Sequence, residues 1–172
     1  TAASLAIGDF TLLMVLKDSA ATSKENYFTS FGYNNSDSAI MFTPDTGRDP
    51  RFIIVKSGSL TQIQNLPDSA TGKRLFTVVK NGNNIEVFVD GTSVGSSTDS
   101  GFNTTINEIV ELGFAVVRDK AGTYFGGEFG DYILTLNAES ETVRQKMEGW
   151  AAHKRDIEVN LPAGHPYKSS PP

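Results

Sequence analysis

The stretch from Phe125 to Asp156 constrains the fold more than any other part of this sequence. From Glu128 to Leu136, large apolar side chains alternate with small or polar ones, as in a half-buried strand. From Glu141 onward the spacing of the apolar residues becomes helical. The residues that make this stripe are Val143, Met147, Trp150 and Ala151. The pattern therefore predicts a strand that leads into one amphipathic helix, from about Ser140 to Lys154.

We expect this helix to pack on a β scaffold through Met147 and Trp150. The charged residues Arg144, Lys146 and Glu148 lie on other faces of the helix. Ser140 can cap the helix start, but Val143 stands where a glutamate would complete a capping box.

Two hairpin signals precede this region. Asn81-Gly82 follows the β-rich residues 74–80, and Asp90-Gly91 follows residues 84–89. Asn-Gly and Asp-Gly pairs supply the positive φ angles that tight hairpins require. We therefore predict two successive chain reversals, the second leading into a short strand at residues 92–95.

Further apolar or β-branched stretches between polar loops predict the remaining strands. They span residues 9–17, 26–33, 38–43, 51–56, 106–117 and 124–136, with a short ragged strand near 60–63. The tail beyond Ile157 holds four prolines and is expected to be extended or irregular. About nine evenly spaced strands and one late helix predict an all-β fold, an antiparallel β-sandwich of jelly-roll type, as a single domain over residues 1–172.

Composition excludes several classes of function. The 15 Lys and Arg residues stand against 20 Asp and Glu, a net charge of -5, and no basic cluster is long enough for nucleic acid. The longest apolar run, Phe10 to Leu16, is too short to span a bilayer, so membrane insertion is not expected. Cysteine is absent, which excludes disulfides, thiolate metal sites and cysteine nucleophiles.

Two parts of the chain resemble a known family. Residues 77–95 resemble the central hairpin of concanavalin A-like, laminin G-type jelly rolls. Residues 127–134 (GEFGDYIL), 144–154 (RQKMEGWAAHK) and 161–172 (LPAGHPYKSSPP) resemble the closing segment of a branch found in phage structural and bacterial surface proteins.

This resemblance implies a non-catalytic structural or binding module of a virion, of decoration or fibre type, with possible carbohydrate recognition. The alternative is a carbohydrate-binding adhesion domain of a secreted bacterial surface protein. The implied partners are a glycan or other subunits, and the implied location is a virion, the cell surface or the extracellular space. The strand that opens such domains is missing ahead of Thr1, so we expect a free N-terminal edge and an oligomer or larger assembly.

The acidic residues do not suggest a glycosidase. Such an enzyme on this scaffold needs carboxylates two residues apart on one strand face, about 5 Å from each other in a retaining enzyme. Glu108 and Glu111 are three apart, as are Glu128 and Asp131, so each pair is expected to point to opposite faces. The sequence predicts a protein that is not an enzyme.

Three single residues allow two interpretations each. His153 and His165 lack a neighbouring acid and serine pattern, which favours structural roles over catalytic ones. Trp150 could be a platform for a sugar, but its place on the stripe with Met147 favours a core position.

The loops predict a binding rim. If every connection is antiparallel, residues 34–37, part of 57–73, Asp90-Gly91 and 118–122 gather at one end of the sandwich. The candidate ligand-binding residues there are Tyr33, Asn34, Asn35, Asp37, Asp119 and Tyr124. Carboxylate oxygens of Asp37, Asp90 and Asp119 suit Ca²⁺, although no cofactor is required by the pattern. The alternative is that these loops are simply polar, and the count fails if Asp90-Gly91 is a kink.

Overall fold

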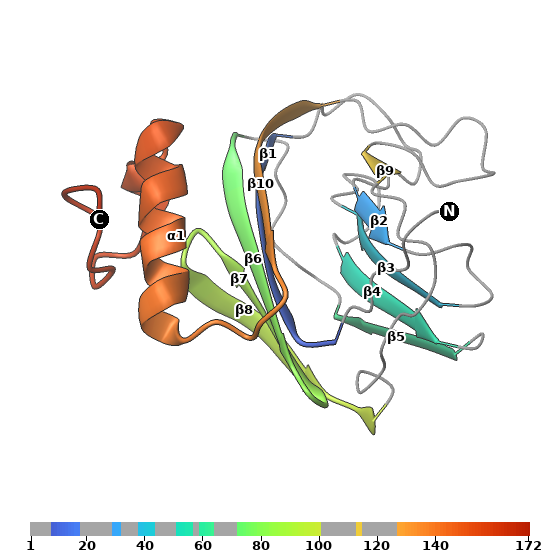
Figure 1. Cartoon of the computed structure of the whole chain (residues 1–172). Helices are drawn as coiled ribbons and strands as arrows, with labels where there is room; N and C mark the ends of the chain where they lie inside the picture. The colour runs from blue at the N-terminus through green and yellow to red at the C-terminus, as the bar shows by residue number, and fades with distance from the viewer. Residues whose placement is uncertain are drawn as a thin grey trace.

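The computed structural model describes residues 8–17, 29–31, 38–43, 51–56, 59–63, 72–100, 113–114 and 127–172. The first sheet has the order β10-β1-β6-β7-β8, and the second has the order β5-β4-β3-β2-β9 (Figure 1). The first sheet consists of Glu128–Thr135 (β10), Phe10–Lys17 (β1), Arg74–Asn81 (β6), Asn84–Val89 (β7) and Thr92–Thr98 (β8). The second consists of Ser59–Ile63 (β5), Arg51–Lys56 (β4), Ser38–Thr43 (β3), Thr29–Phe31 (β2) and Gly113–Phe114 (β9).

Every strand pair in both sheets is antiparallel. The predicted antiparallel β-sandwich is therefore confirmed. The ragged strand near residues 60–63 is confirmed as β5, and the last strand begins at Glu128. Most of the strand predicted at 106–117, and the first residues of the one predicted at 124–136, lie outside the described residues.

The strand β1 is apolar on both faces because both faces are covered. Phe10, Leu12, Met14 and Leu16 belong to the core between the sheets, together with Phe52 of β4. The rings of Phe10 and Phe52 lie 6.4 Å apart between centroids. Leu13 and Val15 point the other way and belong to a second core beneath the helix. A continuous apolar run is the pattern of a strand buried on both sides.

The expected free N-terminal edge is wrong. β1 pairs with β10 on one side and with β6 on the other, so it lies inside its sheet. The C-terminal strand β10 returns alongside β1 and takes the edge position itself. Among the described strands, β10 and β8 are the edges of this sheet.

Both predicted reversals are confirmed. Asp90 and Gly91 have φ angles of 51° and 78°, and Val89 pairs with Thr92 across this turn. Gly82 has a φ of 56° in the turn that connects β6 to β7.

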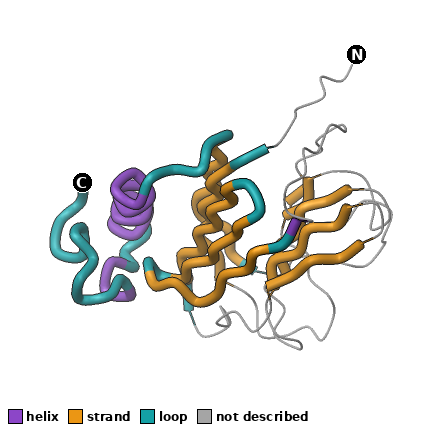
Figure 2. Tube along the Cα trace, turned by 90° about the horizontal axis from the view of Figure 1, so that it is seen from below, coloured by secondary structure: helices purple, strands orange, loops and turns teal. Residues whose placement is uncertain are grey.

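The helix α1 spans Glu141–Lys154 and lies on the outer face of the first sheet, away from the second sheet (Figures 1 and 2). Ser140 caps it, and its Oγ accepts a hydrogen bond from the Val143 amide at 3.4 Å. The tail is less irregular than expected, because Glu158–Asn160 forms a short 3-10 helix (η2). Within the described ranges, no helix has the length and apolar character needed to cross a membrane.

Candidate functional site

The inner face of α1 differs from the predicted apolar stripe. Ala151 and Ala152 are fully buried and pack with Leu13 and Val15 of β1. Small side chains let the helix approach the sheet closely, and this contact sets the rotation of α1. Trp150 is therefore 43% exposed, so the predicted core position is wrong.

Charged side chains occupy the rest of the inner face. Arg144 and Glu148, predicted on other faces, are buried, and Glu148 is 0% exposed. The Arg144 guanidinium donates to both Glu148 oxygens, at 2.8 and 2.6 Å. It also stacks 3.8 Å from the ring centroid of Phe88 on β7. The buried charges are tolerated because each has a partner.

The C-terminal tail completes this network. His165 is buried, and its Nε2 lies 3.3 Å from Glu148 Oε2. Nε2 of His153 lies 2.9 Å from the carbonyl oxygen of Tyr167. Both contacts hold the tail against α1, in agreement with structural roles for the two histidines.

Gly149 and Tyr167 fit closely at the same place. A Cβ on Gly149 would clash with the Cβ of Tyr167, so only glycine allows the tail this close to α1. Leu161 is buried in the second core, whereas Pro166 is exposed. We call the set Arg144, Glu148, Gly149, His153, His165 and Tyr167 the clasp. All clasp residues lie in segments that carried the C-terminal resemblance, and their role here is to fix the tail.

The carboxylates of β10 were placed wrongly by simple alternation. Met14 pairs with Tyr132 and Leu16 with Phe129, so β10 carries an extra residue opposite Val15. This bulge shifts the side-chain alternation by one position. Glu128 and Asp131 therefore share the helix-facing side of the sheet.

Neither carboxylate suits a general acid. Lys17 donates a hydrogen bond to Glu128 at 3.0 Å and thereby lowers the pKa of that carboxyl. Arg155 and Lys154 donate to Asp131 at 2.6 and 2.7 Å, and the Arg155 hydrogen bond is the main reason that the pKa of Asp131 is lowered. A glycosidase acid must instead hold its proton near neutral pH, which needs a raised pKa.

Most of the predicted binding rim lies outside the described residues. These rim residues are Tyr33, Asn34, Asn35, Asp37, Asp119 and Tyr124. The described member of the calcium set is Asp90, which is 5% exposed. Its oxygens accept hydrogen bonds from Arg74 Nη1 at 2.7 Å and from the Leu75 amide at 2.9 Å. In the described part of the chain, no three His, Asp or Glu side chains come together as metal ligands.

The turn that holds Asp90 is also covered. A Cβ on Gly91 would lie 3.0 Å from Cδ2 of His165 and 3.4 Å from Cδ of Pro162. The C-terminal tail thus packs on the Asp90-Gly91 reversal, and Asp90 serves in the structure as an anchor for Arg74 and β6.

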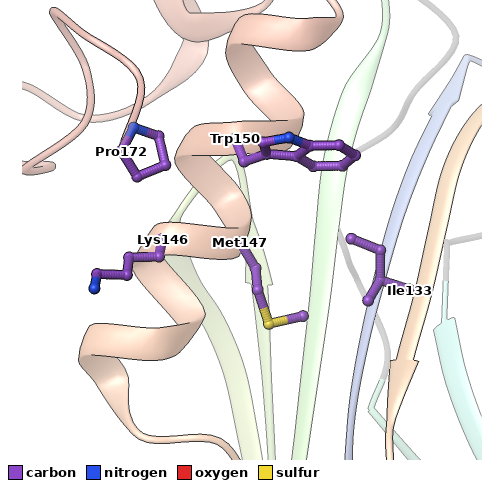
Figure 3. Close-up of a pocket in the computed structure, with 5 residues that line it drawn as sticks. All are labelled: Ile133, Lys146, Met147, Trp150 and Pro172. Carbon is purple, nitrogen blue, oxygen red and sulfur yellow. The ribbon is translucent and has the colours of Figure 1, made fainter.

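An open groove lies between α1 and the edge strand β10. It has a volume of about 470 Å³ and is lined by Ile133 on β10, by three helix residues and by Pro172. The helix residues are Lys146, Met147 and Trp150. Figure 3 shows the Trp150 indole and the Met147 side chain extending toward Ile133, while Lys146 extends the other way, on the side of Pro172. In the sequence, Trp150 could be a sugar platform or a core residue, and its place on the stripe with Met147 favoured the core. A helical wheel does not show which arc of the helix meets the sheet.

A second pocket, of about 320 Å³, lies where α1 begins. It is lined by Val79, Glu86, Phe88, Glu139, Glu141 and Arg144. Its cation, Arg144, is already bound to Glu148, and Glu86 accepts a hydrogen bond from Ser93 at 2.6 Å. The cation of this pocket therefore has a structural partner, unlike Lys146 of the groove.

No family model matches the chain, and no curated protein matches its sequence. Solved structures do match its fold. The CBM40 domain of the Ruminococcus gnavus IT-sialidase superposes with a TM-score of 0.64 at 12% identity, over 80% of this chain and 81% of that one. The same domain has been solved bound to α2,3-sialyllactose.

Two animal proteins are similar in the same way. The heptameric SAP-like pentraxin of Limulus polyphemus gives a TM-score of 0.61 at 14% identity, over 80% of this chain and 68% of that one. The mouse laminin alpha1 LG4-5 structure gives 0.59 at 12% identity, over 78% of this chain and 37% of that one. At such low identity the likeness concerns the fold. Together with the two antiparallel sheets, it shows that this chain has the concanavalin A-like, laminin G-like jelly-roll fold.

Proposed function

We propose that this chain is a non-catalytic module that binds a carbohydrate and is displayed on a virion or a cell surface. The observation that carries the proposal is the open groove around an exposed tryptophan. Exposed aromatic rings present an apolar face together with a polar edge, which suits the mixed surface of a sugar. The R. gnavus CBM40 domain, which shares the fold, holds α2,3-sialyllactose in one of its structures.

The carboxylates of β10 support a role without catalysis. Glu128 and Asp131 share one face, but Glu128 is bound by Lys17 and Asp131 by Lys154 and Arg155, and each carboxyl has a lowered pKa. Neither can act as the proton donor that glycosidic bond cleavage needs. We expect reducing-end release from β-glucans to stay at the level of a buffer blank, and release above it would overturn this part of the proposal.

The setting on a virion is proposed from the resemblance of residues 127–172 to phage structural proteins. The same resemblance supports the second candidate, an adhesion domain of a secreted bacterial surface protein. In either setting the edge strands β10 and β8 offer backbone groups to a neighbouring subunit. Light scattering separates an assembled form from a monomer, and a strictly monomeric chain would contradict the assembly.

The test of the function is a glycan array probed with the whole chain, with and without a chelator. Binding to at least one class of glycan is expected. Loss of binding on chelation would support a calcium site at Asp37 and Asp119, without Asp90, whose two oxygens are bound by Arg74 and the Leu75 amide. Unchanged binding would remove calcium from the proposal. An array without any signal, for the chain as prepared and for its assembled form, would overturn carbohydrate binding itself.

A further inference from the structure

We infer that the Trp150 groove is an acidic-sugar subsite, in which a pyranose ring stacks on the indole and its carboxylate pairs with Lys146. The inference rests on the proposed function, because it names the place and the sugar class for the same activity. It moves the binding site from the loop rim to the groove between α1 and β10.

The first step is the state of the indole. Trp150 is nearly half exposed and lines the groove beside Met147. The Lys154 ammonium lies 4.3 Å from its ring centroid, which fixes the ring from one side by a cation–π contact. The helix that carries it is held to the sheet and the tail by the clasp. A rigid aromatic surface loses little conformational entropy when a ligand stacks on it.

The second step is the charge at the groove. Lys154 is paired with Asp131 at 2.7 Å, so its charge is already used. Lys146 forms no hydrogen bond or ion pair with any described residue, and it is exposed beside Pro172. The groove therefore offers one uncommitted cation although the chain as a whole carries a charge of -5. A carboxylate is its natural partner.

The third step separates a sugar from an apolar protein partner. A protein surface that covered Ile133, Met147 and Trp150 would also desolvate Lys146, which costs free energy unless that surface supplies an acid. A sugar ring with one apolar face and one carboxylate covers the apolar side chains and also supplies the acid that Lys146 needs. The volume of about 470 Å³ lies in the range of small-ligand sites.

Because the groove has few polar groups, it recognises a ring face and a charge more than a pattern of hydroxyls. We therefore expect modest affinity, a preference for acidic over neutral sugars, and affinity that falls as salt is added.

The experiment uses a property of the chain: Trp150 is its only tryptophan. The intrinsic tryptophan emission of the whole protein therefore reports this groove and no other site. We titrate α2,3-sialyllactose and, in parallel, neutral lactose. A saturable change in emission with sialyllactose and a change that needs at least about tenfold more lactose are expected.

Variants are measured by calorimetry with the same two sugars. Trp150→Ala should weaken sialyllactose binding about tenfold or more, and Trp150→Phe should restore part of it. Lys146→Glu should remove the preference for the acidic sugar, so that sialyllactose binds no more tightly than lactose. Val159→Ser is the matched control, because Val159 is an exposed apolar residue that does not line the groove. Circular dichroism confirms that each variant is folded.

The outcomes separate the two proposals. Glycan binding on the array that leaves the tryptophan emission unchanged and survives Trp150→Ala would overturn the groove and keep the proposed function. Absence of any glycan binding would overturn both. Equal binding of both sugars by the wild type, or emission changes produced only by apolar peptides, would overturn the acidic-sugar assignment.

Discussion

Two sides of α1 are buried in a way that the polarity of their residues does not suggest. The side toward β7 and the tail carries Arg144 and Glu148, both buried, while the side toward the edge strand β10 carries Trp150, nearly half exposed. Average helix polarity is thus a poor guide to which side is inside. Burial follows the closest contact that the backbone can make, and here Ala151 and Ala152 make it.

The comparison also separates two kinds of residue. The clasp residues contact each other and hold the tail against α1, so their role is stability. The groove residue Trp150 is nearly half exposed, and its proposed role is recognition. Variants on the two sides should therefore affect different measurements.

The largest effect is expected for Glu148→Ala. It leaves Arg144 buried without its carboxylate and His165 without its contact, and should lower the free energy of unfolding by about 3–5 kcal/mol. Chemical denaturation measures the loss. Glu141→Ala is the control, since Glu141 is exposed on the same helix and should change stability little. A loss below about 1 kcal/mol for Glu148→Ala would contradict the clasp.

The next effect is expected for Gly149→Ala. The added Cβ clashes with Tyr167, and crowding of about 1–3 kcal/mol should outweigh a gain of nearly 1 kcal/mol in helix propensity. Denaturation should show a net loss, and amide exchange should be faster in residues 161–168. The double variant with Tyr167→Gly should recover the propensity gain in part. A stabilised single variant would show that the tail is not held against α1.

A smaller effect on stability is expected for Trp150→Ala. A buried tryptophan would cost about 3–5 kcal/mol on truncation, but this one is 43% exposed and should cost about 1 kcal/mol. Thermal or chemical unfolding compares it with Leu161→Ala, whose buried side chain should cost more. Equal losses for the two variants would mean that Trp150 is a core residue after all.

The smallest effect is expected for a variant of Asp131, which lies on β10 and binds Lys154 and Arg155 at the C-terminal end of α1. Its pKa is lowered in the fold, so its contribution to stability is present above the unfolded value, near 3.8, and is lost as the pH falls through the lower folded value. Asp131→Asn should therefore cost less than about 1 kcal/mol at neutral pH, because Lys154 and Arg155 are partly exposed. The free energy of unfolding, measured from pH 2 to pH 7 in steps of about one pH unit, should fall less steeply toward acid pH in the variant than in the wild type. Equal pH dependence in the two proteins would contradict the ion pairs.

The sequence predicted those features that depend on local pattern. The Asp90-Gly91 reversal was predicted because tight hairpins require positive φ angles. The start of α1 was predicted because the Ser140 hydroxyl can cap a helix. Alternation failed at Asp131, because a bulge opposite Val15 cannot be seen in one strand alone. The groove was missed as a site because its exposure depends on how α1 is rotated.

By itself the sequence determined the fold class, the two tight hairpins, the limits of α1 and the absence of cysteine chemistry. These depend on interactions within a few residues, or on composition. The tertiary structure alone decided that β1 lies inside its sheet, that Arg144 and Glu148 face inward, and that Trp150 faces solvent. Each of these is fixed by a partner distant in the chain, namely β10, His165 and the β1 surface beneath Ala151. Side-chain periodicity defines the faces of an element, and only packing against such partners decides which face is buried.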